Sequence, residues 1–381
     1  MRVTRIRVED FRCIGRVDCE ISPLTVLIGP NAAGKSSLLE AIRFFTPLHS
    51  GVSFSSALAP QGGFPANRRY QAAETSPIKL GVSVADEPRT FHYDVSLRGE
   101  GATGCFIESE TLRRKLTHTD DVYSDETLLD RADTVIRLKG AHGTPVAHDS
   151  TSVVHRFTGE YREMERFLEA LQRISLWKAH RFHPDGPIRR PQQLLSSANP
   201  QENGQELYST LYTMRLERPQ VYNELLEVIR LAVPEFERLE FPPAGGGMIN
   251  LAWHQSDLVS PLYPPQLSDG IVRFLWLMTV LHSVPDDGLV LLDEPELSLH
   301  PQWLMLLVSV LRSMSARTTI LVATQSVEFV RWCKPEELVV ANLTDKRSEL
   351  VRPRDRDDLD AWLKDFNLGE LWTMGELGGR R

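Results

Sequence analysis

The sequence is poor in cysteine and in long hydrophobic runs. Its 381 residues include four cysteines, and none of them forms a C-x-x-C pair. This spacing predicts neither a disulfide framework nor a thiolate zinc site. The longest uncharged apolar stretches, such as Phe274 to Leu281, are far too short to span a membrane, and charges stand where a signal peptide needs an apolar core. We therefore expect a cytoplasmic protein without a membrane segment.

A surplus of basic residues is also missing. The chain carries a formal net charge of −8, which argues against a surface that is permanently coated with DNA. Residues 156–190 nevertheless hold eight Lys and Arg against five Asp and Glu. Two interpretations stay open for this stretch: a local patch that binds duplex DNA, or a solvated helix face of mixed charge over residues 161–176.

A phosphate-binding loop stands near the N-terminus. It follows a short apolar run, Leu24 to Ile28, and opens a helical stretch, Ser37 to Phe45. The pattern G-x-x-x-x-G-K-S is formed by Gly29, Pro30, Asn31, Ala32, Ala33, Gly34, Lys35 and Ser36, with Ser37 next. Backbone N–H groups of such a loop surround the phosphates of a nucleotide, and Lys35 adds a positive charge. The Ser36 hydroxyl is expected to ligate the Mg²⁺ that accompanies ATP.

Two adjacent carboxylates end an apolar run near the other end of the chain. The run Leu289 to Leu292 is typical of a buried parallel strand and is followed by Asp293 and Glu294. Asp293 is expected to hold Mg²⁺, and Glu294 to polarise the water that attacks the γ-phosphate. Together with the phosphate-binding loop, this pair predicts a P-loop NTPase with an α/β fold.

A second anion-binding turn precedes that strand. Ser268, Asp269 and Gly270 follow Leu267 and stand ahead of an apolar helical run, Ile271 to Leu281. A Leu-Ser-x-Gly turn at this place resembles the signature motif of ABC-type ATPases, in particular of their SMC and RecF relatives. The resemblance implies that Ser268 and Gly270 meet the γ-phosphate of an ATP bound to a second copy of the chain. The alternative is a plain N-capped helix, with Ser268 or Asp269 as the cap.

The resemblance also implies an architecture. It is a two-lobed ABC-type ATPase head with a mixed sheet and a short helical insertion, which forms a homodimer that holds two ATP molecules. No heptad pattern lasts long enough for the long coiled coil of an SMC protein. The first strand ends in Phe11 and Arg12, similar to RecF-type proteins, in which the arginine approaches the nucleotide. A solvated strand-end charge is the alternative for Arg12.

One position departs from most relatives. The apolar strand Thr319 to Thr324 ends in Gln325, where most relatives have a histidine. Gln325 can hydrogen-bond the γ-phosphate or the attacking water but carries no positive charge, so we expect slow hydrolysis. Glutamine here is similar to one branch of standalone bacterial ATPases related to the OLD (overcoming lysogenization defect) proteins. The catalytic set that the resemblance implies is Glu294, Lys35 and Gln325.

One element of the ABC-type family is not recognisable. Its glutamine loop should follow a strand near Ile174 to Lys178, and no glutamine stands at a clear strand end there. The nearest candidates, Gln192 and Gln193, are more typical of plain loop residues. We assign neither of them to the site.

The order of the motifs divides the chain into four segments. Residues 1–155 are expected to form the N-terminal lobe, 156–245 a helical insertion and linker, 246–345 the C-terminal lobe, and 346–381 a tail. The stretch after Ser326 is too short for the TOPRIM nuclease domain that OLD-type proteins carry. We therefore expect an ATPase whose output passes to another chain.

Three functions fit an ATP-driven dimer. The first is the sensor or regulatory ATPase of a bacterial anti-phage defence system that works with a separately encoded effector nuclease. The second is a standalone RecF-like DNA repair or maintenance ATPase, for which DNA is the partner. The third is a nucleotide-gated scaffold that binds ATP with little hydrolysis, with Gln325 as the clue. The ranking follows from the resemblance and not from any single residue.

Overall fold

A computed structural model of the protein describes residues 1–116, 124–132, 134–138, 144–146, 148–157, 161–178, 185–196, 200–344, 347–355 and 358–378. The strands are β1 (Arg2–Phe11), β2 (Ile14–Glu20), β3 (Leu24–Ile28), β4 (Ile78–Asp86), β5 (Arg89–Glu100), β6 (Gly104–Leu116), β7 (Ser124–Ala132), β8 (Val135–Leu138), β9 (Thr144–Pro145), β10 (Ile174–Lys178), β11 (Gln192–Gln193), β12 (Phe236–Glu240), β13 (Pro243–Gly245), β14 (Met248–Ile249), β15 (Ala252–Gln255), β16 (Leu289–Asp293), β17 (Thr319–Thr324), β18 (Leu338–Thr344) and β19 (Arg347–Val351). The α-helices are α1 (Lys35–Arg43), α2 (Phe54–Leu58), α3 (Gly63–Asn67), α4 (Arg162–Gln172), α5 (Leu207–Glu217), α6 (Pro219–Ala232), α7 (Asp269–Ser283), α8 (Pro301–Met314), α9 (Val327–Arg331), α10 (Leu359–Trp362) and α11 (Leu368–Met374).

The central sheet gathers strands from distant parts of the chain. Its order is β10-β16-β17-β3-β18-β19, and all neighbours are parallel except the edge pair β18 and β19. The strands β3, β16 and β17 are buried at every position, as expected for parallel strands that are covered on both faces. Their carboxyl ends therefore meet at one edge, where the predicted nucleotide residues follow β3, β16 and β17.

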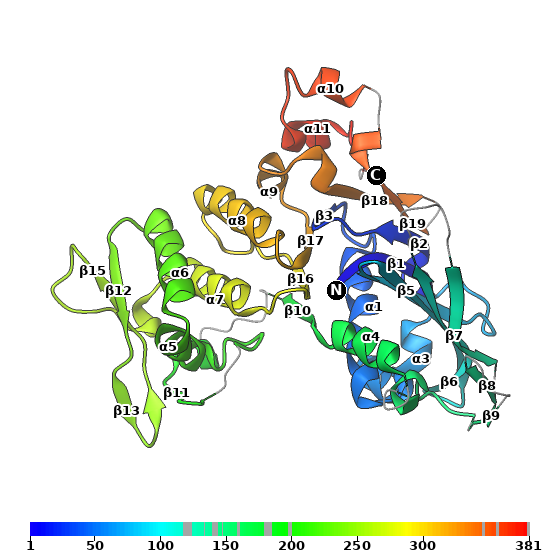
Figure 1. The fold of residues 1–381 in the computed structure, drawn as a ribbon. Helices are drawn as coiled ribbons and strands as arrows, with labels where there is room; N and C mark the ends of the chain where they lie inside the picture. Colours follow the sequence, from blue (N-terminus) through cyan, green and yellow to red (C-terminus); the bar gives the residue numbers. More distant parts are fainter. Residues whose placement is uncertain are drawn as a thin grey trace.

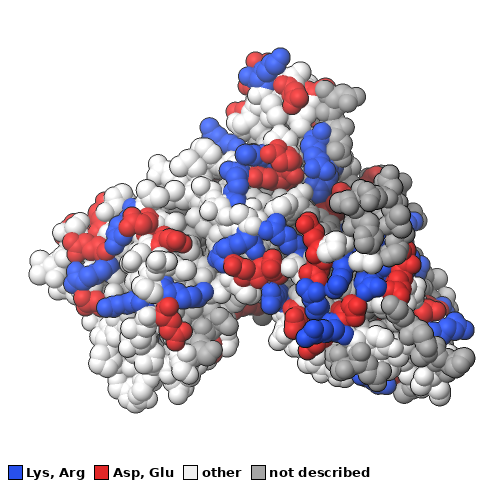
Figure 2. Space-filling model, viewed as in Figure 1, with Lys and Arg blue, Asp and Glu red and all other residues white. Residues whose placement is uncertain are grey.

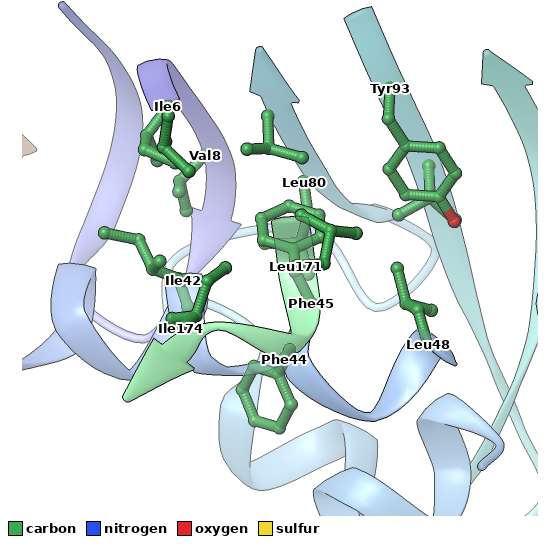
Figure 3. Packing of buried hydrophobic residues seen from close by; sticks show 14 of the residues in the cluster. Ile6, Val8, Ile42, Phe44, Phe45, Leu48, Leu80, Tyr93, Leu171 and Ile174 are labelled. Atoms are coloured by element: carbon green, nitrogen blue, oxygen red, sulfur yellow. The ribbon is translucent and has the colours of Figure 1, made fainter. Parts of the chain in front are cut away.

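A second sheet covers one side of this core. Its order is β2-β1-β4-β5-β6-β7-β8-β9, and every pair is antiparallel. Figure 3 shows side chains of this sheet, such as Ile6 and Leu80, facing Ile42 of α1 and Phe45 just after it. All four side chains are nearly inaccessible to solvent, so α1 is packed between the two sheets.

The opposite face of the central sheet packs on helices. Along β3, Leu27 belongs to the core with the antiparallel sheet, whereas Val26 and Ile28 belong to the core formed with α5, α6, α7 and α8. This alternation follows from the period of two in a strand. Figure 1 shows the resulting lobes: α5, α6 and α7 extend to one side of the central sheet, and α1, α4 and the antiparallel sheet to the other.

The helices are short. The longest helix among the described residues is α7, with 15 residues, so this part of the chain contains no long coiled coil. A proline opens α6 directly after α5 ends, because proline is tolerated in the first helical turn but not in a helix interior. Within the described residues, no helix is both long and apolar enough to cross a bilayer.

Candidate nucleotide-binding site

The phosphate-binding loop joins β3 to α1, as predicted. Lys35 opens α1, and its ammonium Nζ donates to the carbonyl oxygens of Gly29 at 2.7 Å and Pro30 at 3.0 Å. The Lys35 side chain is buried, which lowers its pKa, while the carboxylates of Glu294 and Asp293 oppose that shift. Lys35 is thus bonded to its own loop and lies close enough to the predicted metal ligand Asp293 and the predicted catalytic Glu294 to be influenced by both charges.

Two glycines of the loop allow close approach of other backbone and side-chain atoms. Gly29 has a φ of +150°, and a Cβ there would lie 2.4 Å from the carbonyl oxygen of Ala341 in β18. Gly34 caps α1 with a φ of +96°, and a Cβ there would lie 2.6 Å from Ser348 Oγ. A side chain at either position would collide with the neighbouring strands, so the glycine pattern has a steric cause.

Ser36 and Asp293 meet across the sheet edge. The Ser36 hydroxyl donates to Asp293 Oδ1 at 3.0 Å, although the two residues are 257 positions apart in the sequence. Asp293 is 5% exposed, whereas Ser36 faces solvent. A hydroxyl and a carboxylate are the oxygen ligands that Mg²⁺ prefers. The two residues therefore fit the predicted metal site, and their role as ligands stays a prediction.

Glu294 follows β16 in a strained conformation. Its φ is +52°, which is uncommon for a residue with a side chain, and its N–H donates to the carbonyl oxygen of Ala323 at 2.8 Å. Backbone strain of this kind is frequent at functional sites. The catalytic role of Glu294 stays a prediction, and its place beside Asp293 and Lys35 agrees with it.

A further carboxyl lies beside Glu294. Glu296 Oε1 accepts a hydrogen bond from Thr324 Oγ1 at the end of β17. Burial raises the pKa of Glu296 to about 7, and the charge of Glu294 adds to this effect. Thr324 Oγ1 in turn accepts from the N–H of Ser326 at 2.9 Å, so Glu296 is tied to the turn that carries Gln325. Gln325 itself is exposed, and its contact with a phosphate stays a prediction.

Arg12 is held in a network of side chains. Its Nε donates to Asn67 Oδ1 at 3.0 Å, and its Nη2 donates to Gln61. Gln61 Nε2 donates to Glu40 Oε2 at 3.1 Å, and Glu40 also pairs with Lys178. These bonds favour a structured role for the half-buried Arg12 over the alternative of a solvated strand-end charge. Whether Arg12 contacts the nucleotide stays a prediction.

The predicted strand at Ile174 to Lys178 exists as β10 and lies next to β16. Lys178 stands in register with Asp293. The next six positions, 179–184, lie outside the described residues, and with them any glutamine-loop equivalent that directly follows β10. Gln192 serves the fold instead, because its Nε2 donates to the carbonyl oxygens of Gly204 at 2.8 Å and Pro187 at 3.1 Å.

The signature-like turn lies in the other lobe. Ser268 is the N-cap of α7, and its Oγ accepts from the N–H of Ile271 at 3.3 Å. The cap uses the hydroxyl oxygen as acceptor and leaves its proton for donation to a ligand, so capping and phosphate contact are compatible. Gly270 packs closely on the segment after Glu294, because a Cβ there would lie 2.9 Å from the carbonyl oxygen of Ser298. Ser268 and Asp269 are exposed, and α7 lies in a different lobe from α1 (Figure 1).

Charges of both signs share the surface. Figure 2 shows Lys and Arg interspersed with Asp and Glu over this face of the molecule. In the basic stretch 156–190, residues 158–160 and 179–184 lie outside the described residues. Arg156 pairs with Asp149 at 3.6 Å and Arg166 with Asp86 at 3.1 Å. These pairs favour the interpretation of a mixed-charge surface over that of a DNA-binding patch.

A known family covers most of this chain. Residues 24–331 match a family described as "AAA domain, putative AbiEii toxin, Type IV TA system". The chain belongs to this AAA-domain family. The match begins at the strand before the phosphate-binding loop and ends in α9, after Gln325, so it includes both predicted halves of the site. Membership of a P-loop ATPase family implies nucleotide binding with a divalent metal.

The chain is also similar in sequence to a RecF protein and to an OLD nuclease. The DNA replication and repair protein RecF of Aliivibrio fischeri (strain MJ11) is 26% identical over 186 residues, 46% of this chain and 50% of RecF. The OLD nuclease of Thermus scotoductus (strain ATCC 700910 / SA-01) is 27% identical over 108 residues, 26% of this chain and 20% of the nuclease. The AAA-domain chain thus spans half or less of these relatives. The predicted resemblance to RecF/SMC-like ABC-type ATPases related to the OLD family is confirmed.

The fold agrees with this relationship. A crystal structure of an SMC head bound to the C-winged helix domain of ScpA superposes with a TM-score of 0.52, covering 92% of this chain and 97% of that chain at 12% identity. At such low identity the likeness concerns the fold alone. The predicted fold class, an ABC-type head with a mixed sheet, is confirmed.

Proposed function

We propose that this protein binds and hydrolyses ATP and acts as an ATP-dependent homodimeric switch in the cytoplasm. The observation that carries the proposal is the meeting of two distant motifs at one sheet edge. There the loop with Lys35 and Ser36 adjoins the carboxylates of Asp293 and Glu294. A P-loop, a metal-binding hydroxyl and a carboxylate pair are the parts that phosphoryl transfer to water requires.

Each residue has a distinct task in this proposal. The loop N–H groups and Lys35 bind the phosphates, and Glu294 orients the attacking water and accepts its proton. Gln325 supplies a hydrogen bond to the water or the γ-phosphate without a positive charge. A Mg²⁺ held by Ser36 and Asp293 would neutralise charge on the polyphosphate. The neutral Gln325 is the reason to expect slow turnover.

Dimerisation completes the site in this proposal. The exposed Ser268 and its half-buried neighbour Gly270 lie in the lobe opposite α1, so we infer that they meet the ATP of a second copy. ATP would then join two subunits, and hydrolysis would separate them. The SMC head-like fold supports this arrangement, since it provides two lobes with the two anion-binding turns on different sides.

Turnover of purified protein tests the enzymatic part. Lys35→Ala should abolish ATP binding, and Glu294→Gln should keep binding but lower the rate about 100-fold or more, because general bases contribute about that much. The exposed Glu235 offers a matched control, so Glu235→Gln should turn over ATP like the wild type. Turnover of Glu294→Gln at the wild-type rate would contradict the assignment. Wild-type protein that binds ATP with negligible turnover would favour the scaffold alternative.

The biological role is a further part of the proposal. Similarity to the OLD nuclease links this type of ATPase to a nuclease, so we propose a sensor ATPase of anti-phage defence that controls a separately encoded effector nuclease. Similarity to RecF over 46% of this chain favours a standalone DNA repair or maintenance ATPase as the second candidate.

Purification from the native host separates the two roles. Glu294→Gln protein with ATP and Mg²⁺ should bring down a second chain with nuclease activity, and Lys35→Ala protein should not. A bare dimer that binds DNA only with ATP, with affinity falling steeply as salt rises, would support the RecF-like role instead.

A further inference from the structure

Arg189 grips the signature-like turn on both sides of Ser268. It ends a 3₁₀ turn, Pro187–Arg189. Its Nη1 donates to the carbonyl oxygen of Leu267 at 2.9 Å and also to that of Pro264. Its Nη2 donates to the carboxylate of Asp269. One guanidinium thus bonds the residue before Ser268 and the residue after it.

The backbone that carries Arg189 is held in place by buried neighbours. The preceding residue, Ile188, is 1% exposed, and its carbonyl oxygen accepts from the Tyr208 hydroxyl at 2.6 Å. Gly204 touches Ile188 so closely that a Cβ there would lie 2.5 Å from the isoleucine side chain. The Arg189 side chain is 12% exposed, whereas that of Asp269 is 64% exposed. A fixed, largely buried donor therefore holds an exposed turn.

The charge of Asp269 makes such a partner necessary. A carboxylate beside Ser268 would repel any polyphosphate that approaches the N-terminus of α7, since like charges a few ångströms apart oppose each other. The guanidinium of Arg189 offsets this charge by pairing directly with the Asp269 carboxylate. Lysine could not do the same, because one ammonium lacks the planar fork that bonds several acceptors at once.

We propose that Arg189 is a positioning residue of the signature-like turn, which orients Ser268 and neutralises Asp269 so that the turn can receive the phosphates of a partner-bound ATP. This inference rests on the proposed ATP-dependent dimer. It assigns a role in dimer closure to a residue that contacts neither the phosphate-binding loop nor the catalytic carboxylates through any bond that the structure shows.

The test compares ATP binding by the monomer with ATP-dependent dimerisation. In the Glu294→Gln background, Arg189→Ala should weaken ATP-dependent dimerisation about tenfold or more, because it leaves the charge of Asp269 uncompensated a few ångströms from the phosphates. The affinity of the monomer for a fluorescent ATP analogue should stay within about twofold, because the loop of the same chain is untouched. The dimerisation affinity of Arg189→Lys should lie between those of the parent and of Arg189→Ala. The exposed neighbour Arg190 provides the control, since Arg190→Ala should dimerise like the parent.

Further outcomes test how Arg189 acts. Adding Asp269→Asn to Arg189→Ala should restore part of the dimerisation, since it removes the unpaired carboxylate. Dimerisation of Arg189→Ala at the parent level, or a parallel loss of monomer ATP affinity, would overturn the positioning role. If the parent Glu294→Gln protein does not dimerise with ATP, the proposed function fails, independently of Arg189.

Discussion

Burial raises the pKa of the Glu296 carboxyl to about 7 from an ordinary value of 4.5, and repulsion by Glu294 adds to the shift. Between these two pH values the folded chain binds more protons than the unfolded chain. The contribution of Glu296 to the free energy of unfolding therefore falls as pH rises from 4.5 through 7, and it is lost above that range. Glu296 Oε2 is buried and finds no hydrogen-bond partner in the described part of the chain.

Glu296→Gln, a neutral residue of nearly the same shape, tests this contribution of Glu296 to stability. At pH 8 without nucleotide, Glu296→Gln should be about 1–3 kcal/mol more stable than the wild type, because no charge is then buried. At pH 5 the two proteins should unfold at nearly the same urea concentration. Parallel pH profiles of the two proteins would show that Glu296 is ionised without cost in the folded state.

Single residues differed in how far the sequence could reveal them. Lys35, Ser36, Asp293 and Glu294 stand in contiguous motifs, and their placement at one sheet edge follows from the strands before them. Arg189 has no such signal, because its partner Asp269 is 80 residues away. Contacts between residues so far apart in the sequence depend on the tertiary fold, and no local sequence pattern predicts them.

At the scale of elements, α1 is fastened to two neighbouring strand ends. Ser36 bonds Asp293 at the end of β16, and Glu40, one turn later on α1, pairs with Lys178 at the end of β10. Lys178 and Asp293 stand in register, so their side chains share one face of the sheet. Although burial opposes it, the hydrogen bond from Lys178 lowers the pKa of Glu40.

Removing the lysine should loosen this helix. Lys178→Met leaves the buried Glu40 carboxylate without its main partner, so the free energy of unfolding should fall by about 3–5 kcal/mol. Lys178→Met combined with Glu40→Gln should recover part of the loss. Lys364→Met, at an exposed site, should cost little. Urea unfolding of the four proteins checks this, and equal stability of Lys178→Met and Lys364→Met would contradict it.

Elements themselves were predictable where the pattern was simple. Strands β3, β16 and β17 were expected from apolar runs that end in polar motif residues. The pairing of β10 with β16 was not predicted, because the segment 156–245 was expected to be a helical insertion and linker. In the structure this segment contributes the edge strand β10 to the central sheet. Pairing partners far apart in sequence are set by tertiary packing, which the period of two does not encode.

At the scale of the whole molecule, the two anion-binding turns lie in different lobes (Figure 1). A single chain therefore presents the phosphate-binding loop and the exposed Ser268 separately, and in the proposed function a second copy brings the two kinds of turn together. The two-lobed head was predictable from motif order, since the loop and the carboxylates lie at opposite ends of the chain. How the lobes are oriented was not, because it depends on the packing of α5 to α8 against the sheet.

The central claim is that ATP joins two copies of this chain, and the native mass of Glu294→Gln protein tests it most directly. With ATP and Mg²⁺ the mass should equal two chains of 43.1 kDa each, and without nucleotide it should equal one. Adding Ser268→Arg should keep ATP binding and return the mass to that of one chain. A Glu294→Gln protein that binds ATP and stays monomeric at every concentration would contradict the account.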